Sequence, residues 1–236
     1  MKMNVFDKFN LTEKFVKEIF IISFFLCLYI EAFSQLSNPN VINRANEIAT
    51  REAKFTLNYN DVNGSPYYTS DFVKSVAYLK DGNFASIPLR YDIFRDEIEF
   101  MNGNKISWLK KNDVKFVRYG SEMMILTHAV TDTSQLGYFF LNSTGNYKLL
   151  TKRIVEYNPE VPAKGYSETV PANFKRQRDE FYIQLEGKPA LKVKTNKDLN
   201  AIFANNQLAL DYIKKEKIKV SKSQSIQNLI DYLNKK

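Results

Sequence analysis

The chain has 236 residues, of which 44% are hydrophobic, and it carries a formal net charge of +8. This length and apolar content are sufficient for one good-sized domain with its own hydrophobic core. The single histidine excludes a multi-histidine metal centre.

The N-terminal region contains an uncharged apolar run from Ile19 to Ile30, followed by Glu31 and the small residues Ala32 and Ser34. At about 1.5 Å per residue this run would span roughly 18 Å as a helix, well short of the ~30 Å hydrocarbon core. The pattern predicts a signal peptide over residues 1–34 that is cleaved after Ser34. Acidic residues lie among the lysines before the run, so an uncleaved signal anchor is the alternative.

Cleavage at this point would remove Cys27, the only cysteine. The exported chain could then have no disulfide, no thiolate nucleophile and no cysteine-ligated metal centre. We expect it in the periplasm, associated with the outer membrane, or outside the cell, with no transmembrane span left after cleavage.

Beyond the signal peptide, the composition predicts four further segments. Residues 35–66 are rich in Asn, Ser and Gly and read as an irregular N-terminal arm. Residues 67–157 contain short strand-like segments separated by turn residues at hairpin spacing, which indicates an antiparallel β-rich domain. The strands are expected at 73–79, 84–93, 97–101, 105–109, 114–119, 123–130, 137–141 and 147–157.

Residues 158–178 include Pro159, Pro162 and Pro171 and are expected to form an extended connector. Residues 179–236 are predicted to form a small basic unit with a hairpin (180–185 and 190–194) and three helices. The fold class is therefore α+β and mainly β: an antiparallel meander, either a sandwich or a curved sheet, followed by a β-hairpin and a three-helix C-terminal unit.

The expected helices differ in their sequence signals. Thr195 or Asn196 can cap the first helix, and the second covers about residues 207–216. For the third, Ser221 with Gln224 predicts a capping box. Its apolar residues form one stripe that should face the core. They are Ile226, Leu229, Ile230 and Leu233.

The large apolar residues change from odd to even positions near Phe94. A change of one residue in register moves side chains to the other face of a sheet. A bulge or a tight turn is therefore expected between Phe94 and Asp96.

Few residues are candidates for chemistry. His128 lies in an apolar segment without a Gly-x-Ser-x-Gly motif, so it reads as an ordinary strand histidine. Glu97 and Glu99 would share one face of a strand, where paired carboxylates could cleave a glycoside, but alternation with Ile98 equally describes a solvated strand face. We assign no catalytic, cofactor-binding or metal-binding residue, and no cofactor.

Two aromatic sites could belong to a carbohydrate-stacking surface, although packing in the core or a hairpin explains them as well. They are Trp108 and the pair Tyr67-Tyr68.

The positive charge is concentrated near the C-terminus, where the segment from Gly187 to Lys236 has 11 lysines, four acidic residues and no arginine. Such a segment can attract an anionic surface polymer or lipid headgroups, or it can simply be a solvated helical surface. Because arginine is missing, we expect no nucleic-acid partner.

Several short stretches resemble a group of uncharacterised exported proteins from Bacteroidetes-type bacteria. The likeness extends from Gly64 to the C-terminus and implies export and the order of β-rich body, connector and helical tail, without an activity. The stretches are Gly64-Ser65-Pro66-Tyr67 with Phe72, Leu89 to Phe94, Asp96 to Phe100, Pro162-Ala163-Lys164, and Asp179 to Tyr182.

These observations favour an exported, non-enzymatic interaction or accessory module whose partner is an envelope protein or an anionic surface polymer. The first alternative is a hydrolase acting on glycan or peptidoglycan through Glu97 and Glu99. The second is anionic-surface binding through the lysine-rich tail.

The export prediction is tested by cell fractionation and N-terminal sequencing of the native protein. We expect the protein outside the cytoplasm with Gln35 as its first residue, because the apolar run is too short to remain as an anchor. Recovery of the uncleaved chain from the cytosol would contradict export.

Overall fold

The computed structural model describes residues 57–129, 132–166 and 168–236, and the side chains of 132–135 are not described. All of these residues belong to one compact unit, which covers 44–236. The predicted signal peptide, Cys27 and most of the predicted N-terminal arm lie outside the described residues.

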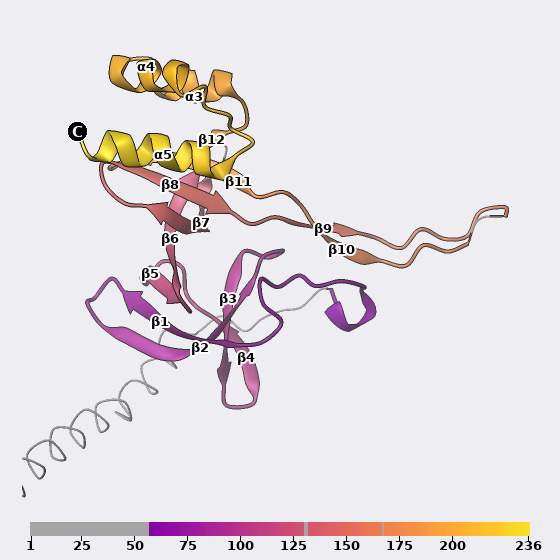
Figure 1. The fold of residues 1–236 in the computed structure, drawn as a ribbon. Coiled ribbons are helices and arrows are strands. Elements are labelled where there is room, and N and C mark those ends of the chain that lie inside the picture. Colours follow the sequence, from indigo (N-terminus) through magenta and orange to yellow (C-terminus); the bar gives the residue numbers. More distant parts are fainter. Residues whose placement is uncertain (1–56, 130–131, 167) are drawn as a thin grey trace, which may run out of the picture. The chain divides into compact units, whose positions relative to one another are not determined.

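One large antiparallel sheet of ten strands dominates the fold (Figure 1). Its strand order is β12-β11-β8-β7-β6-β5-β1-β2-β3-β4, so neighbours along the chain are mostly neighbours in the sheet. The strands are β1 (Val73–Leu79), β2 (Phe84–Asp92), β3 (Glu97–Asn102), β4 (Lys105–Trp108), β5 (Val114–Tyr119), β6 (Glu122–Ala129), β7 (Asp132–Ser143), β8 (Tyr147–Lys152), β11 (Glu180–Leu185) and β12 (Leu191–Val193).

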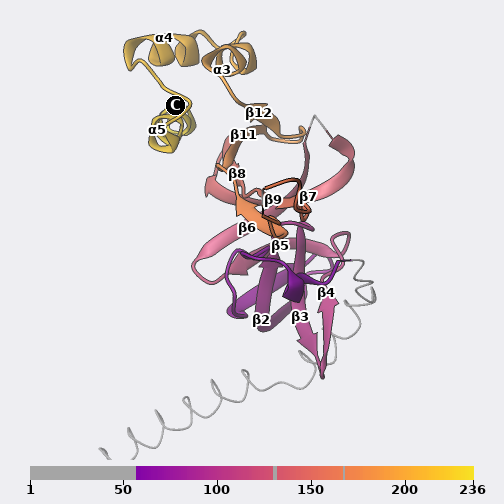
Figure 2. The same ribbon diagram turned by 90° about the vertical axis from the view of Figure 1, so that its right-hand side faces the viewer.

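Three helices follow the last strand: α3 (Asn196–Ile202), α4 (Gln207–Lys215) and α5 (Ser223–Asn234). Figures 1 and 2 show them beside β8, β11 and β12, at the opposite end of the sheet from β4. A short 3-10 helix, η1 (Tyr59–Asp61), precedes β1. The predicted fold class, mainly β with a hairpin and three C-terminal helices, is confirmed.

The first core forms because the sheet curls, so that β2 and β3 face β7 although three strands separate β2 from β7 in the sheet order. Tyr91 of β2 contacts both Tyr138 and Phe140 of β7, with ring centroids 6.0 Å apart in each pair. These rings are buried with Leu89 and Ile98. Burial of so many aromatic and branched side chains is the main stabilising contribution at this end.

A second core lies between the helices and the strands at the other end of the sheet. The predicted apolar stripe of α5 is buried against Leu149 of β8, Ile183 of β11 and Val193 of β12. Leu150, the next residue of β8, faces the opposite side and packs with Phe139 and Tyr182. Because side chains alternate along β8, Leu149 packs in the second core and Leu150 packs in a separate apolar cluster on the other face.

The helix starts show one confirmed and one wrong prediction. Thr195 caps α3 in a capping box with Asp198. The box predicted from Ser221 and Gln224 is absent, since α5 begins after Lys222, which makes no side-chain cap hydrogen bond. The apolar stripe, rather than a cap, therefore positions α5.

The predicted change of face near Phe94 is a tight turn between β2 and β3. The amide of Asp96 donates to the carbonyl of Ile93 over 3.3 Å, and Asp96 has φ of +56°. Aspartate tolerates this left-handed conformation better than most residues. The turn directs the Asp96 carboxylate towards Tyr91, Tyr138 and Lys152.

A hairpin that sequence reasoning missed joins the end of the predicted strand 147–157 to the predicted connector 158–178. β9 (Val155–Asn158) pairs with β10 (Asn173–Arg176), and Val161 bridges Val170 farther out. None of the three prolines is itself a paired residue. The hairpin can therefore form around them, although its ladder is interrupted where they lie. β11 joins the main sheet through β8, so strands of the predicted 67–157 and 179–236 segments share one sheet.

Two buried tyrosines provide a matched test of this core. Tyr91 donates its hydroxyl to Asp96 over 2.7 Å, whereas the hydroxyl of Tyr138 has no hydrogen-bond partner among the described residues. We expect Tyr91→Phe to lower the free energy of unfolding by about 1–3 kcal/mol and Tyr138→Phe to leave it unchanged or raise it by up to about 1 kcal/mol. Urea denaturation measures both, and equal losses would contradict the assignment.

The same tyrosines predict sensitivity to alkali. Burial raises the pKa of both Tyr91 and Tyr138 well above the ordinary value. Unfolded tyrosines ionise near about pH 10, so the stability contributed by the buried neutral forms is present below that pH and lost as the pH rises above it. The loss should be smaller in Tyr138→Phe than in the parent protein.

Candidate functional site

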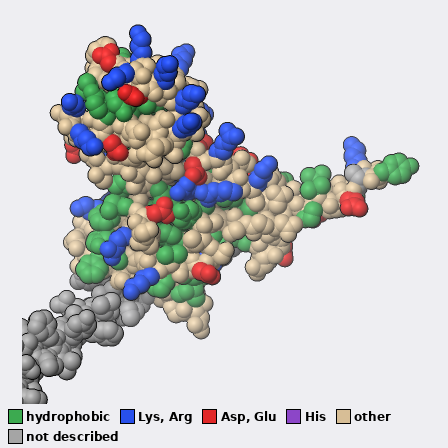
Figure 3. Space-filling model, in the orientation of Figure 1, with side chains coloured by type: hydrophobic (Ala, Val, Ile, Leu, Met, Phe, Trp, Pro, Cys, Tyr) green, Lys and Arg blue, Asp and Glu red, His purple; other side chains and the backbone are tan. Residues whose placement is uncertain are grey.

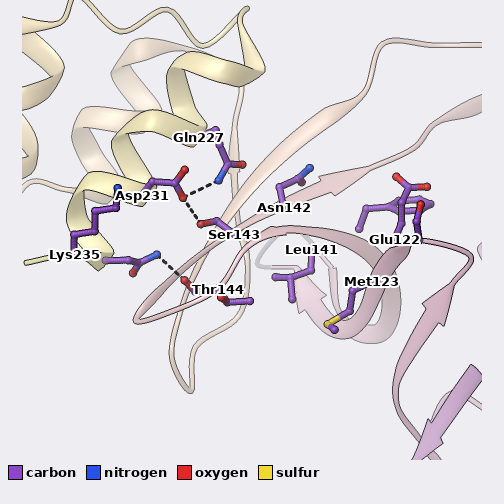
Figure 4. Close-up of a pocket in the computed structure, with 12 residues that line it drawn as sticks. Glu122, Met123, Leu141, Asn142, Ser143, Thr144, Gln227, Asp231 and Lys235 are labelled. Carbon is purple, nitrogen blue, oxygen red and sulfur yellow. Dashed lines mark hydrogen bonds between the residues drawn. The ribbon is translucent and has the colours of Figure 1, made fainter.

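A polar pocket of about 780 Å³ lies between the sheet and α5 (Figure 4). Its walls are residues 121–123 at the start of β6, residues 140–144 at the end of β7, and Gln227, Asp231, Asn234 and Lys235 at the C-terminal half of α5. This volume is within the usual range for small-molecule sites.

An irregularity in β7 accounts for the four consecutive β7 residues, 140–143, in the pocket wall. Leu141 pairs with Leu150 and Ser143 pairs with Leu149, so Asn142 is an extra residue opposite the partner strand. In a regular strand only alternate side chains would face the same side. A bulge re-aims the side chains around it, which lets Leu141, Asn142 and Ser143 all line the pocket.

Hydrogen bonds hold α5 against the end of β7. The hydroxyl of Ser143 donates to Asp231 Oδ1 over 2.6 Å. The Asn234 amide donates to the carbonyls of Thr144 and Tyr147 and accepts from the amide of Tyr147. A β-carbon at Gly145, which has φ of +131°, would lie only 2.5 Å from the Asn234 side chain, so only glycine fits beneath this contact.

Hydrogen bonds join several polar side chains of this pocket to one another. Asp231 accepts hydrogen bonds from both Ser143 and Gln227, and among the described residues neither a histidine nor Lys235, the one lysine of the lining, is hydrogen-bonded to Ser143. A carboxylate alone is a weak activator of a serine hydroxyl at neutral pH. Sequence reasoning missed this site because Ser143 and Asp231 are 88 residues apart.

A second pocket, of about 390 Å³, contains a compact group of charges from three parts of the chain. Lys152 of β8 lies 2.5 Å from Asp96 and donates to the carbonyl of Tyr138 over 2.9 Å. Lys111 lies 3.4 Å from Asp96 and 3.6 Å from Glu97. Burial lowers the pKa of Lys152. Because each charge faces an opposite charge, the group reads as a structural network that closes the curled sheet.

Glu97 and Glu99, the predicted carboxylate pair, have different surroundings. Glu97 lines the second pocket beside Lys111. Glu99 is fully buried and is held by both Nε and Nη2 of Arg90, at 3.0 and 2.7 Å. Burial raises the pKa of Glu99, and the ion pair with Arg90 opposes that rise. The two carboxylates therefore do not line one common pocket among those found in the described residues.

His128, the only histidine, is half-buried on β6, where its backbone carbonyl accepts from Ala190 over 2.8 Å. It lies at a register shift between β6 and β7. His128 does not line any of the three pockets found among the described residues.

The aromatic candidates are engaged in internal packing. Tyr67 stacks beneath the Arg90 guanidinium at 3.8 Å, and Tyr68 donates its hydroxyl to Glu122 over 2.8 Å. Trp108 is buried opposite Glu99 on the neighbouring strand. These rings thus stabilise the sheet and the segment that leads into β1.

The lysines of the C-terminal segment are exposed from Lys194 to Lys236. Among the described residues two ion pairs join lysines of this segment to carboxylates, one between Lys192 and Glu180 and one between Lys215 and Glu216 at 3.9 Å. Figure 3 shows blue side chains around the helices. Attraction of this surface to anionic polymers stays a prediction.

Within the described ranges, no group of three or more His, Cys, Asp or Glu residues is arranged to hold a metal ion. The helices of the same ranges include none that is both long and apolar enough to cross a membrane. Comparison with protein-family models, curated proteins and solved structures gives no match for this chain. The functional proposal therefore rests on the sequence and on the geometry described above.

The contact between α5 and β7 can be tested by replacing two asparagines of α5, one that makes the contact and one that does not. Asn234→Ala removes three hydrogen bonds, two of them with the partly buried Tyr147, so we expect the free energy of unfolding to fall by about 2–3 kcal/mol. Asn228→Ala is the control, since Asn228 is exposed and only accepts from Gln224. It should change stability by less than about 0.5 kcal/mol. Similar values for both variants in urea denaturation would contradict the proposed contact.

Proposed function

We propose that this chain is an exported, non-enzymatic interaction module of the cell envelope or extracellular space, and that the hairpin β9–β10 makes its partner contact. The apolar run at Ile19–Ile30 supports export, as argued from the sequence. The hydrogen-bonded but unactivated groups of the pocket beside α5 support binding over catalysis.

The exposed apolar end of the hairpin is the observation that carries this proposal. Val161 is 58% exposed and Val170 54%, and Tyr166 near the turn is fully exposed. Figure 1 shows the hairpin extending away from the sheet, and Figure 3 shows hydrophobic side chains towards its far end. All described residues from Pro159 to Pro171 are exposed, so the apolar side chains here are not covered by the described part of this chain.

The base of the hairpin is firmly anchored. Val155 and Phe174 are buried in the first core. Asn63 exchanges backbone hydrogen bonds with Ala172 and Phe174, at 3.0 and 2.7 Å. An anchored base with an exposed apolar end presents side chains at low conformational cost, which favours binding.

A protein surface suits this hairpin better than an anionic membrane. Glu160 and Glu168 flank the apolar side chains, with Lys164 as the one basic residue of the turn region. Acidic groups are repelled by anionic headgroups. Burying two valines and a tyrosine on a partner would supply several kcal/mol of favourable free energy, and tyrosine is enriched among the residues that dominate interfaces.

Site-specific photocross-linking in the producing cells tests this proposal. A benzophenone amino acid at Tyr166 should give a discrete cross-linked species in the envelope fraction, because this side chain would lie in the interface. The same group at Phe84, a 54%-exposed apolar residue of β2, is the matched control and should not give that species.

A double change, Val161→Ser with Val170→Ser, should weaken the Tyr166 cross-link by about tenfold without changing the melting temperature, since both side chains are exposed. Identical cross-links from Tyr166 and Phe84, or none from Tyr166, would contradict the role of the hairpin.

A further inference from the structure

We propose that the pocket between β7 and α5 binds a glycan segment without net charge. This site is separate from the apolar end of the hairpin and does not depend on the hairpin's partner. Its open hydrogen-bonding atoms, its apolar wall, its charge and its paired backbone each bear on the class of ligand.

The open polar atoms are a mixture of donors and acceptors. Asn142 uses its carbonyl oxygen to accept from Thr151 over 2.6 Å, so both N–H groups of its amide remain available among the described residues. Gln227 donates to Asp231, which leaves its carbonyl oxygen and Asp231 Oδ2 as acceptors within the same described part. Sugar hydroxyls donate and accept at once, and such a mixed set matches them.

An apolar wall lies beside these atoms. Met123 is 39% exposed, and Leu141 and Phe140 line the same pocket. Figure 4 shows Met123 and Leu141 on the sheet side, with Gln227 and Asp231 on the helix side. A pyranose ring has an apolar C–H face and a hydroxyl rim, so it can satisfy both walls together. The thioether of Met123 adapts easily to such a surface.

The charge of the lining disfavours an anionic ligand. Glu122 and Asp231 are acidic and Lys235 is the one basic residue of the lining. Arg153 lies 3.7 Å from Glu122 and is also paired with Asp179. A phosphate or uronate would meet net negative charge here, whereas a neutral sugar pays no such penalty.

The backbone of β7 disfavours a peptide bound as an added strand. β7 pairs with both β6 and β8 at Phe140, and farther along the chain Leu141 and Ser143 pair with β8, so the edge towards β8 is occupied beside the pocket. Strand addition needs a free edge. The extra residue Asn142 interrupts the regular ladder of β7, so we expect recognition in this pocket to use side chains.

The test is an NMR titration of the purified full chain with three neutral trisaccharides: maltotriose, cellotriose and tri-N-acetylchitotriose. Trigalacturonate and a capped neutral hexapeptide of Gly and Ser serve as the contrasting probes. We expect at least one neutral sugar to shift the signals of Asn142, Gln227 and Met123 at up to about 10 mM, and the two contrasting probes to bind at least about tenfold more weakly.

Variants link the binding to the pocket. Asn142→Asp keeps the acceptor for Thr151 but removes both donors and adds negative charge, so sugar affinity should fall by about tenfold or more. Asn104→Asp makes the same change in the exposed β3–β4 turn and should alter affinity by less than about twofold. Met123→Ala removes an exposed side chain and should weaken binding about threefold while the protein remains folded.

The proposal is overturned if none of the three sugars shifts the pocket signals at that concentration, or if Asn142→Asp and Asn104→Asp bind the sugar equally well. Tighter binding of trigalacturonate would overturn the neutral class, and tighter binding of the peptide would overturn the glycan class. Each result is independent of whether Tyr166 cross-links to a partner.

Discussion

The Asp96 carboxylate is the interaction on which the curled sheet depends. It accepts from Tyr91 of β2 and from the backbone of Tyr138 in β7, and it pairs with Lys152 of β8 and with Lys111. Strands far apart in the sheet order thus meet at one group. Gly137 is part of this arrangement, because a β-carbon there would approach both Asp96 and Lys152 to 3.2 Å. These donors offset the cost of partly burying the Asp96 carboxylate.

The two ends of the sheet are coupled through β7 and β8. Tyr138 and Phe140 belong to the first core, whereas Phe139 packs in the cluster with Leu150 and Tyr182. Leu149 of β8 packs against the helices. The pocket beside α5 is therefore built on strands that the first core already fixes in position. A binding site on such a rigid base needs little ordering when a ligand arrives, which preserves affinity.

The sequence predicted most of the strands because their turns have strong local signals, such as Gly103-Asn104 between β3 and β4. The α5 stripe was equally clear. The hairpin β9–β10 was missed because prolines normally argue against pairing, and the Asn142 bulge depends on the partner strand, which no local pattern reports. The Ser143–Asp231 contact joins residues 88 positions apart, so only the assembled fold brings them together.

The position of α5 along the chain determines when the pocket can form during translation. One wall of the pocket is made of β6 and β7, and the other is α5, which follows every strand of the sheet along the chain. A ribosome therefore completes the whole sheet before it makes the residues that close the site. Any ligand-binding capacity of the pocket can appear only after α5 has been made and has docked, so a chain interrupted before α5 would lack it.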